Sequence, residues 1–423
     1  MKTPKETAHA QTKHVDVAII GGGPAGLAAA IQLYQNGIHN IIIIEREKQL
    51  GGILRQCIHD GFGLTRFSEM LSGPEYAQAF IDQVETLGVP YLVNASVVHF
   101  SPEKHLTVVT PSGLQTWDAK AVILTTGCRE RTRGALGIPG DRPVGVFTAG
   151  VAQAYINLYN RMPAKEVVIL GSGDIGLIMA RRLTLEGAHV QAIFEIQPYP
   201  NGLPRNIQQC ANDYHIPLYL NHTVTQIHGR NRLTGVTVSQ VDKDRQPIAG
   251  TDKFYPCDTL ILSVGLIPEN ELSREAGVAL DPRTNGPVVN EFYQTSLDGV
   301  FVSGNVLQVH DLVDYVSLEA ERMAGNVTAY LHKGALPESS IRIVAKNSIG
   351  YTVPQRISGQ SDFLLSLRVS RPLTDCRISV CQDGKEIAFR KLKKAIPAQL
   401  IQLTVSTDKL SSGHDLEVSA HEN

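Results

Sequence analysis

The stretch VDVAIIGGGPAGLAAAIQLYQN, residues 15–36, decides the fold of this chain. Its β-branched beginning predicts a strand over Val15–Ile20, and its Ala- and Leu-rich continuation predicts a helix. Between them, Gly21 permits a tight turn, Gly23 lets the backbone approach a pyrophosphate, and Gly26 lets helix and strand pack closely. Because the first turn of such a helix has free N–H groups, the stretch predicts a dinucleotide site.

The strand that follows supports this interpretation. Ile41–Ile44 ends in Glu45, near the offset of about 20 residues at which an acid accepts hydrogen bonds from an adenosine ribose. A glycine-rich turn alone can also serve only to close a strand onto a helix, and the acid makes that alternative less favoured. We therefore assign Pro24, Ala25 and Glu45, together with the three glycines, to a first cofactor site.

The same pattern recurs about 150 residues further along the chain. Val167–Leu170 predicts a strand, Gly171–Gly176 a glycine turn, and Leu177–Leu185 a helix. Val190–Phe194 predicts the next strand, and an acid again stands at its end. The residues assigned to this second site are Gly171, Gly173, Asp174, Ile175, Gly176 and Glu195.

The acid at the second site bears on the choice of nucleotide. A carboxylate at Glu195 favours NAD, since it binds the two free ribose hydroxyls and repels a 2′-phosphate. Arg205, in the loop that follows, is the nearest residue that could pair with such a phosphate. A solvated surface arginine is the favoured interpretation of Arg205. The sequence therefore predicts NAD, with NADP as the less favoured nucleotide.

Two dinucleotide motifs in this order resemble the pyridine nucleotide–disulfide oxidoreductase superfamily, in which a nicotinamide domain is inserted into a flavin domain. Further stretches are similar to its signatures: Leu124–Gly127, Ile138–Gly140, Ile261–Gly265 with Pro268, and Thr295 followed by Gly299–Asn305. The resemblance implies FAD at the first site, NAD at the second, and hydride transfer between them.

The resemblance also implies further cofactor-binding residues. It assigns Thr126, Gly127, Gly304 and Asn305 to FAD, and Gly265 to NAD. In the superfamily an aspartate usually stands where this chain has Asn305, and its carboxylate holds a ribityl hydroxyl. An amide can still bond that hydroxyl.

One departure from the superfamily is large. Its disulfide reductases carry C-x-x-x-x-C or C-x-x-C, and the six cysteines of this chain form neither motif. Reduction of thioredoxin, glutathione or lipoamide is therefore disfavoured. Cys57 and His59 lie on the segment that passes the flavin in the superfamily, so they are our candidate catalytic residues. A buried free thiol and a structural histidine are the slightly favoured alternatives.

What remains resembles a branch of the superfamily that forms the flavin subunits of multi-component dehydrogenases. Gln56–Leu64 and Arg129–Gly134 look most like the NAD-linked flavoprotein associated with anaerobic glycerol 3-phosphate dehydrogenase. The resemblance implies a redox partner protein or a dehydrogenase subunit that exchanges electrons with the flavin. Two alternatives stay open, which are a flavin subunit of a small amine or hydroxy-acid dehydrogenase and a non-catalytic dinucleotide-binding redox sensor.

The expected fold class is α/β, with two Rossmann-like domains, one inserted in the other, and a small C-terminal β domain. The expected FAD domain comprises residues 14–150 and 258–332, the NAD domain 151–257 and the β domain 335–423. A late helix is predicted over Leu312–Tyr330. Capping of this helix is the favoured role of His310, Asp311 and Asp314, and a role facing the flavin is the alternative.

Composition excludes several classes of function. The chain has 43% hydrophobic residues, 19% charged residues and a net charge of -2. Because neither sign of charge dominates, nucleic acid is an unfavoured partner. No apolar run reaches the roughly 18 residues of a spanning helix, and residues 1–14 are polar without a signal-peptide pattern. We therefore expect a cytoplasmic protein without a membrane span or a metal site. The sequence leaves an oligomer open.

Overall fold

The computed structural model describes residues 12–411 and 413–422 of the 423-residue chain. It contains two compact units, of which the second, Arg129–Ile267, is inserted into the first. The first unit comprises the chain up to Cys128 and from Pro268 onward. The expected cytoplasmic location was based in part on the polar residues 1–14. Of these, residues 1–11 lie outside the described residues.

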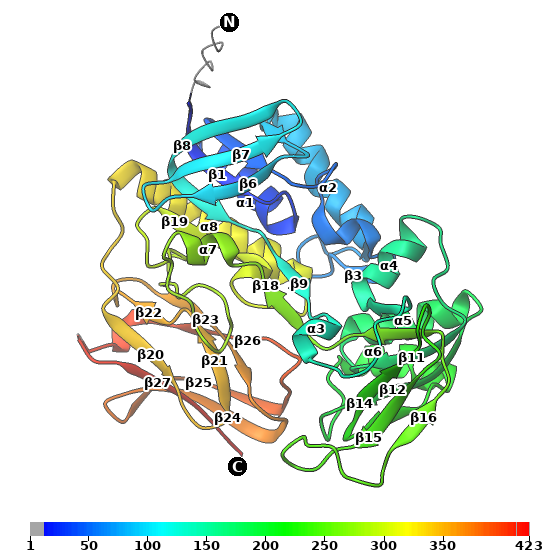
Figure 1. Cartoon of the computed structure of the whole chain (residues 1–423). Coiled ribbons are helices and arrows are strands. Elements are labelled where there is room, and N and C mark those ends of the chain that lie inside the picture. The colour runs from blue at the N-terminus through cyan, green and yellow to red at the C-terminus, as the bar shows by residue number, and fades with distance from the viewer. Residues whose placement is uncertain (1–11, 412, 423) are drawn as a thin grey trace, which may run out of the picture. The chain divides into compact units, whose positions relative to one another are not determined.

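The first unit contains a seven-stranded sheet (Figure 1). β1 lies between β2 and β8 and is parallel to both, while β8, β7 and β6 form an antiparallel meander. All four residues of β2 are buried, as expected for a strand covered on both faces. The strands are β1 (Lys13–Ile20), β2 (Ile41–Ile44), β5 (Tyr91–Leu92), β6 (Ser96–Phe100), β7 (His105–Thr110), β8 (Gly113–Leu124) and β19 (Val300–Val302).

Three long helices pack in this unit, and α1 contacts both of the others. In Figure 1, α1 and α8 lie side by side over the sheet. Pro24 opens α1, where its missing N–H leaves no hydrogen bond unmade. The helices are α1 (Pro24–Gln35), α2 (Gly73–Leu87) and α8 (Val313–Lys333), and shorter elements are η1 (Gly52–Gln56), β3 (Asp60–Phe62), β4 (Leu71–Ser72), α7 (Glu271–Glu275) and η3 (Gly304–Val306).

The start of α8 differs from the prediction. Leu312 is its N-cap and no side chain caps it, so the expected capping by His310, Asp311 and Asp314 is wrong. Asp314 instead accepts hydrogen bonds from the backbone N–H groups of Gly63 and Arg66, at 3.2 and 2.9 Å. The acid therefore holds the loop between β3 and β4 rather than its own helix.

The second unit is built on a five-stranded parallel sheet in the order β10-β17-β11-β12-β13. Val167 and Ile169 join an apolar cluster with helices α4 and α5, while Val168 and Leu170 join one with a three-stranded antiparallel sheet. Alternate side chains of β11 thus bury both faces of the sheet. The elements are α3 (Arg133–Leu136), β10 (Val146–Thr148), α4 (Ala149–Asn157), β11 (Glu166–Leu170), α5 (Asp174–Leu185), β12 (His189–Glu195), α6 (Pro204–Cys210), η2 (Asn212–Tyr214), β13 (Leu218–Leu220), β14 (His222–His228), β15 (Gly235–Gln240), β16 (Lys253–Tyr255) and β17 (Thr259–Leu262).

The inserted unit is longer at both ends than the expected NAD domain of residues 151–257. β17 lies between β10 and β11 in the parallel sheet. Both β10, which precedes residue 151, and β17, which follows residue 257, therefore belong to this unit. The chain enters and leaves the unit at β9 (Cys128–Glu130) and β18 (Leu266–Pro268). Pairing between strands that are far apart in the sequence sets these boundaries, and a local sequence pattern cannot predict such pairing.

The C-terminal residues form a β module whose two sheets share one apolar core. The module nevertheless belongs to the first compact unit. Arg368 of β23 binds Asp311 at 3.3 Å and the carbonyl of Val309 at 3.0 Å, next to the start of α8. Its strands are β20 (Ile341–Ala345), β21 (Ile349–Val353), β22 (Arg356–Ile357), β23 (Phe363–Val369), β24 (Leu373–Gln382), β25 (Lys385–Ala395), β26 (Ile401–Val405) and β27 (Leu416–Glu422).

No helix among residues 12–411 and 413–422 is long and apolar enough to cross a membrane.

Candidate dinucleotide sites

The first glycine turn closes against the end of β8. A Cβ at Gly21 would overlap the carbonyl oxygen of Thr125, and a Cβ at Gly26 would overlap that of Gly21. Thr125 also donates its hydroxyl to the carbonyl oxygens of Ile20 and Gly21, each at 3.0 Å. Glycine is therefore required at 21 and 26 by the packing of strand, turn and helix on one another.

Gly23 serves a different purpose. A Cβ at this position would have only one described neighbour within 4 Å, the Cα of Gly52 at 3.9 Å. Gly23 is also the N-cap of α1, and no side chain caps the helix there. The N–H groups of the first turn are thus left to a ligand, and no side chain obstructs it. This arrangement fits a dinucleotide diphosphate.

Glu45 is buried behind this turn. It accepts hydrogen bonds from the backbone N–H groups of Gly22 and Glu47, at 2.6 and 2.7 Å, through different carboxylate oxygens. Each oxygen of a carboxylate can accept a second bond. The position therefore suits an acid that orders the glycine turn and binds ribose hydroxyls.

The second glycine turn repeats this construction. A Cβ at Gly171 would overlap the carbonyl oxygen of Ser263, and a Cβ at Gly176 would lie 2.6 Å from the Cβ of Ser263. Gly176 donates its N–H to the hydroxyl of Ser263 at 3.0 Å. The middle glycine, Gly173, is again the N-cap of its helix and has no side-chain cap. The strand, turn and helix of this site also fit a dinucleotide.

Glu195 holds the second turn as Glu45 holds the first. It accepts from the backbone N–H of Ser172 at 3.0 Å, from the Ser172 hydroxyl at 2.6 Å, and from the N–H of Gln197 at 2.9 Å. Glu195 is 4% exposed. The structure thus places a buried acid at the end of β12.

Asp174 is tied to the loop after β12. It accepts hydrogen bonds from the backbone N–H of Leu203 at 2.8 Å and from Nδ2 of Asn206 at 2.7 Å. Arg205 is exposed, and none of the ion pairs of the described residues includes it. Asp174 therefore fixes the end of this loop and the start of α6, and Arg205 of α6 lies exposed at the surface as expected.

The later residues assigned to FAD are brought to the first turn from far along the chain. A Cβ at Gly304 would lie 3.1 Å from the Cβ of Ala25, so the two predicted segments meet at the start of α1. Thr126 donates its hydroxyl to the carbonyl of Glu269 at 2.9 Å. Gly127 accepts from the N–H of Glu269 at 3.0 Å, and a Cβ at Gly127 would have no described neighbour within 4 Å.

In the second unit, Gly265 lies two residues after Ser263, just beyond the end of β17. It accepts a hydrogen bond from the N–H of Arg131 at 3.1 Å and has a φ of +101°, a backbone conformation that favours glycine. Ile175 lies in the first turn of α5 and is partly buried. Both residues therefore belong to the same end of the parallel sheet as the second glycine turn.

Comparisons with known proteins identify the family of this chain. The family model for pyridine nucleotide-disulphide oxidoreductases matches residues 15–324. The chain belongs to this family.

Two curated proteins illustrate its relatives. The chain is 24% identical over 413 residues to an opine oxidase subunit of Agrobacterium tumefaciens, covering 90% of this chain and 78% of that protein. It is 28% identical over 320 residues to thioredoxin reductase of Mycolicibacterium smegmatis, covering 75% and 94%. The crystal structure of Lactococcus lactis thioredoxin reductase matches the fold with a TM-score of 0.62 and 21% identity, covering 75% of this chain and 99% of that one.

Members of the pyridine nucleotide-disulphide oxidoreductase family bind FAD and NAD(P)H, and this chain is an oxidoreductase of that kind. Each of its two glycine turns leads into a helix, α1 or α5, whose N-cap makes no side-chain hydrogen bond. The C-terminal β module, which begins at β20 (Ile341–Ala345), lies outside the matched residues.

Cys57, a candidate catalytic residue, directly follows η1. Its thiol lies 3.4 Å from the carbonyl oxygen of Ile53, and burial raises the pKa of the thiol to about 12. His59 is partly buried, its Nδ1 lies 3.1 Å from the carbonyl oxygen of Asp60, and its ring lies 4.9 Å from that of Phe62. A thiol that stays protonated at neutral pH is a weak nucleophile, which favours the structural alternative for Cys57.

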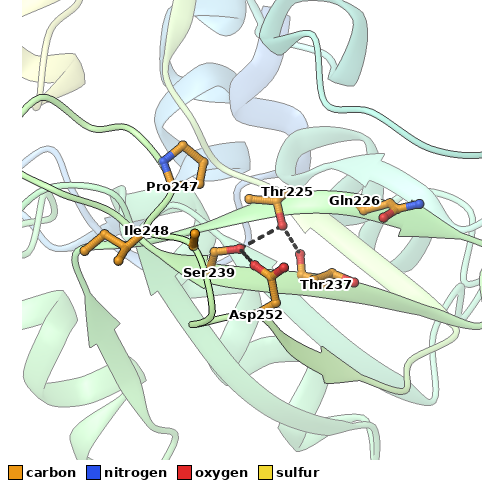
Figure 2. Close-up of a pocket in the computed structure, with 8 residues that line it drawn as sticks. Thr225, Gln226, Thr237, Ser239, Pro247, Ile248 and Asp252 are labelled. Atoms are coloured by element: carbon orange, nitrogen blue, oxygen red, sulfur yellow. Dashed lines mark hydrogen bonds between the residues drawn. The ribbon is translucent and has the colours of Figure 1, made fainter.

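A shallow cavity of about 320 Å³ lies on the antiparallel sheet of the second unit (Figure 2). Thr225, Ser239 and Asp252 point toward one another in it, with hydrogen bonds of 2.9 Å between the hydroxyls and 2.5 Å from Ser239 to Asp252. None of its lining residues belongs to a glycine turn or to the other predicted cofactor residues. We assign the cavity no part in the family's chemistry.

Sequence reasoning missed a buried polar cluster around Glu319 of α8. Glu319 accepts hydrogen bonds from the Gly304 N–H at 2.8 Å, the Ser303 hydroxyl at 3.0 Å, the Gln308 amide at 3.0 Å and Nε2 of His310 at 3.2 Å. Burial alone would raise the pKa of Glu319, but the charge and hydrogen bond of His310 and the other donors lower it below its usual value. An acid on the apolar face of α8 was the available signal, because Glu319 lies between the buried Val316 and Met323 at helical spacing.

Proposed function

We propose that the chain transfers a hydride between NAD(H) and FAD and exchanges electrons with a partner protein or subunit. The observation that supports this most is the equivalence of Glu45 and Glu195, two buried acids that each hold the N–H of the second residue of a glycine turn. One such acid marks one adenosine ribose site. Two of them in separate units call for two dinucleotides.

We assign the following residues to the first cofactor, FAD: Gly21, Gly23, Pro24, Ala25, Gly26, Glu45, Thr126, Gly127, Gly304 and Asn305. We assign these to NAD: Gly171, Gly173, Asp174, Ile175, Gly176, Glu195 and Gly265. When bound, the two cofactors supply the hydride chemistry itself. The residues of the chain bind their diphosphates at the starts of α1 and α5 and orient their riboses through the two acids.

NAD is the proposed nucleotide because of the environment of Glu195. Its two oxygens already accept three hydrogen bonds from the chain, which keeps a carboxylate in place at the end of β12. A 2′-phosphate would meet this anion without a partner, since Arg205 is exposed on α6. Repulsion of a second anion therefore favours NADH over NADPH.

A partner protein is proposed as the electron partner because the chain lacks a redox disulfide. None of the six cysteines, all of which lie in the described part of the chain, forms a disulfide, and the thiol of Cys57 has a pKa raised to about 12. Electrons that reach the flavin must therefore leave for a group outside this chain. Similarity to a protein that is named as one subunit of an opine oxidase supports the same proposal. We place this function in the cytoplasm.

That similarity also favours a second candidate, a flavin subunit that oxidises a small amine or hydroxy acid. Under this alternative, a nucleotide at the second glycine turn would not reduce the flavin. A third candidate, a redox sensor, would bind both cofactors without passing electrons between them.

An anaerobic titration separates the candidates. The purified holoprotein is mixed with one equivalent of NADH, and in a second cuvette with NADPH, while the flavin absorbance is recorded. The proposed function predicts loss of the oxidised flavin bands with NADH and a weaker response to NADPH. Flavin that a small amine or hydroxy acid reduces, and NADH does not, would support the second candidate. Flavin that none of these reduces would support the sensor.

A further inference from the structure

A buried ion pair lies next to the residue proposed to bind the flavin ribityl chain. The side chains of His310 and Glu319 are each 1% exposed, and His310 Nε2 lies 3.2 Å from Glu319 Oε2. The other ring nitrogen of His310, Nδ1, lies 3.3 Å from Oδ1 of Asn305. Hydride transfer as proposed above makes no use of this pair.

The hydrogen bonds define the state of His310. The backbone N–H of His310 also points at Oδ1 of Asn305, at 3.0 Å, and an N–H requires an acceptor. This contact fixes the orientation of the Asn305 amide. Both ring nitrogens of His310 therefore face acceptors, an amide oxygen on one side and a carboxylate on the other. Only an imidazolium, with a proton on each nitrogen, donates to both.

The same contacts fix what Asn305 presents to a ligand. Its oxygen is occupied twice by His310, so its NH₂ group points the other way, with Cys128 Sγ at 3.6 Å. Nδ2 has two protons, and no other bond to the chain is described for it. The residue thus offers a donor where the family usually has an acceptor.

We infer that Glu319 and His310 are positioning residues for the flavin, in which Glu319 holds His310 as a buried imidazolium and His310 turns the Asn305 amide donor toward the cofactor. The inference rests on the proposed FAD site. It also explains why an amide is suited to position 305. The cluster of Glu319, His310 and Asn305 is electrically neutral, whereas an aspartate at 305, a partly buried position, would leave the cluster with one net negative charge.

The first test is made on the unmodified protein without cofactor. With ¹⁵N-labelled histidine, NMR reports whether each ring nitrogen has a proton, and His310→Gln identifies the signal of His310. The inference predicts protons on both nitrogens of His310 in the folded protein. A ring with a single proton would overturn it, and this result does not depend on whether the chain binds FAD.

The second test measures the dissociation constant of FAD by flavin fluorescence. His310→Gln removes the cation but keeps the hydrogen bonds that Glu319 accepts from Gly304 and Ser303. The dissociation constant of FAD is expected to increase roughly tenfold or more, because charged hydrogen bonds are lost. The matched control is Tyr330→Phe, which removes a 2.7 Å bond to Asp298 at the far end of the same helix and should leave FAD binding unchanged. FAD affinity equal to wild type in His310→Gln would contradict the inference.

A double variant distinguishes positioning by charge from a merely structural role. Asn305→Asp alone places a carboxylate beside the imidazolium, but Asn305→Asp combined with His310→Gln leaves that carboxylate unpaired. The inference predicts that the combined loss of FAD affinity exceeds the sum of the two single losses in free energy. Additive losses would overturn it. If wild-type protein binds no FAD, the proposed function fails, and the NMR result still decides the state of His310.

Discussion

Thr125 and Ser263 occupy equivalent positions in the two units. Each follows the last residue of a parallel strand, donates its backbone N–H to the strand that precedes a glycine turn, at 2.9 and 2.7 Å, and fills the space of the missing Cβ at the first glycine. Both also have a hydroxyl in contact with the turn. The duplicated motif of the sequence is thus matched by a duplicated tertiary contact.

Substitution of Gly26, the third glycine of the first turn, should destroy the first site. Gly26→Ala would force a Cβ into the carbonyl of Gly21, so we expect loss of bound flavin and a marked loss of thermal stability. Gly325→Ala is the control, because it lies exposed in α8 with no atom within 4 Å of its Cβ. It should stabilise the protein by about 0.5–1 kcal/mol. Full flavin content in Gly26→Ala would argue against the first site.

Glu195→Gln tests the choice of nucleotide. The substitution keeps the size of the side chain but removes the negative charge, so NADH should bind roughly tenfold more weakly while NADPH binds no worse. Equilibrium titration of each nucleotide against wild type provides the ratio. Arg205→Ala should leave the ratio as it is. A preference for NADH that survives in Glu195→Gln would mean that another group selects the nucleotide.

The thiol of Cys57 should be unreactive over the ordinary pH range. Its pKa is raised to about 12 by burial, so the thiolate fraction stays small at pH 7 and increases only as the pH approaches 12. Alkylation by iodoacetamide, followed by mass spectrometry, should therefore be slow at position 57 at both pH 7 and pH 9. Cys57→Ser should also leave the rate of flavin reduction by NADH within about twofold of wild type. Rapid labelling at pH 7, or complete loss of flavin reduction in Cys57→Ser, would restore the catalytic role for this residue.

Arg368 should stabilise the attachment of the C-terminal module. Its guanidinium contacts Asp311, whose side chain is 5% exposed, so Arg368→Met leaves a buried carboxylate without its cation. We expect a loss of about 3–5 kcal/mol in the free energy of unfolding, measured in urea. Arg342→Met breaks an exposed pair with Asp415 and should cost less than about 1 kcal/mol. Equal losses in the two variants would show that the buried pair has no special importance.

The sequence was sufficient to predict the local secondary structure around the two candidate sites. The strand, the glycine turn and the acid at the end of the next strand follow one another within about 30 residues, and their spacing reports the physical requirements of a diphosphate and a ribose. The α/β fold class is confirmed for the same reason, since each turn requires a parallel strand and a helix around it.

The parts that depend on distant contacts could not be predicted. The limits of the inserted unit follow from the pairing of β17 with β10 and β11, and Asp314 binds a loop about 250 residues earlier instead of capping its helix. Glu319 is similar, because its importance comes from His310 and the turn at Gly304 that the fold brings to it. Such residues show up in a sequence only as polar side chains on an apolar helix face.

The most direct test of the two-cofactor proposal is a single-turnover experiment. The FAD-loaded protein is mixed anaerobically with NADH, or with NADH deuterated at the transferred position of C4, and the oxidised flavin absorbance is followed by stopped flow. Hydride transfer from NADH to FAD predicts a single decay that is slower with the deuterated nucleotide. An oxidised spectrum that NADH leaves unchanged would contradict the central claim.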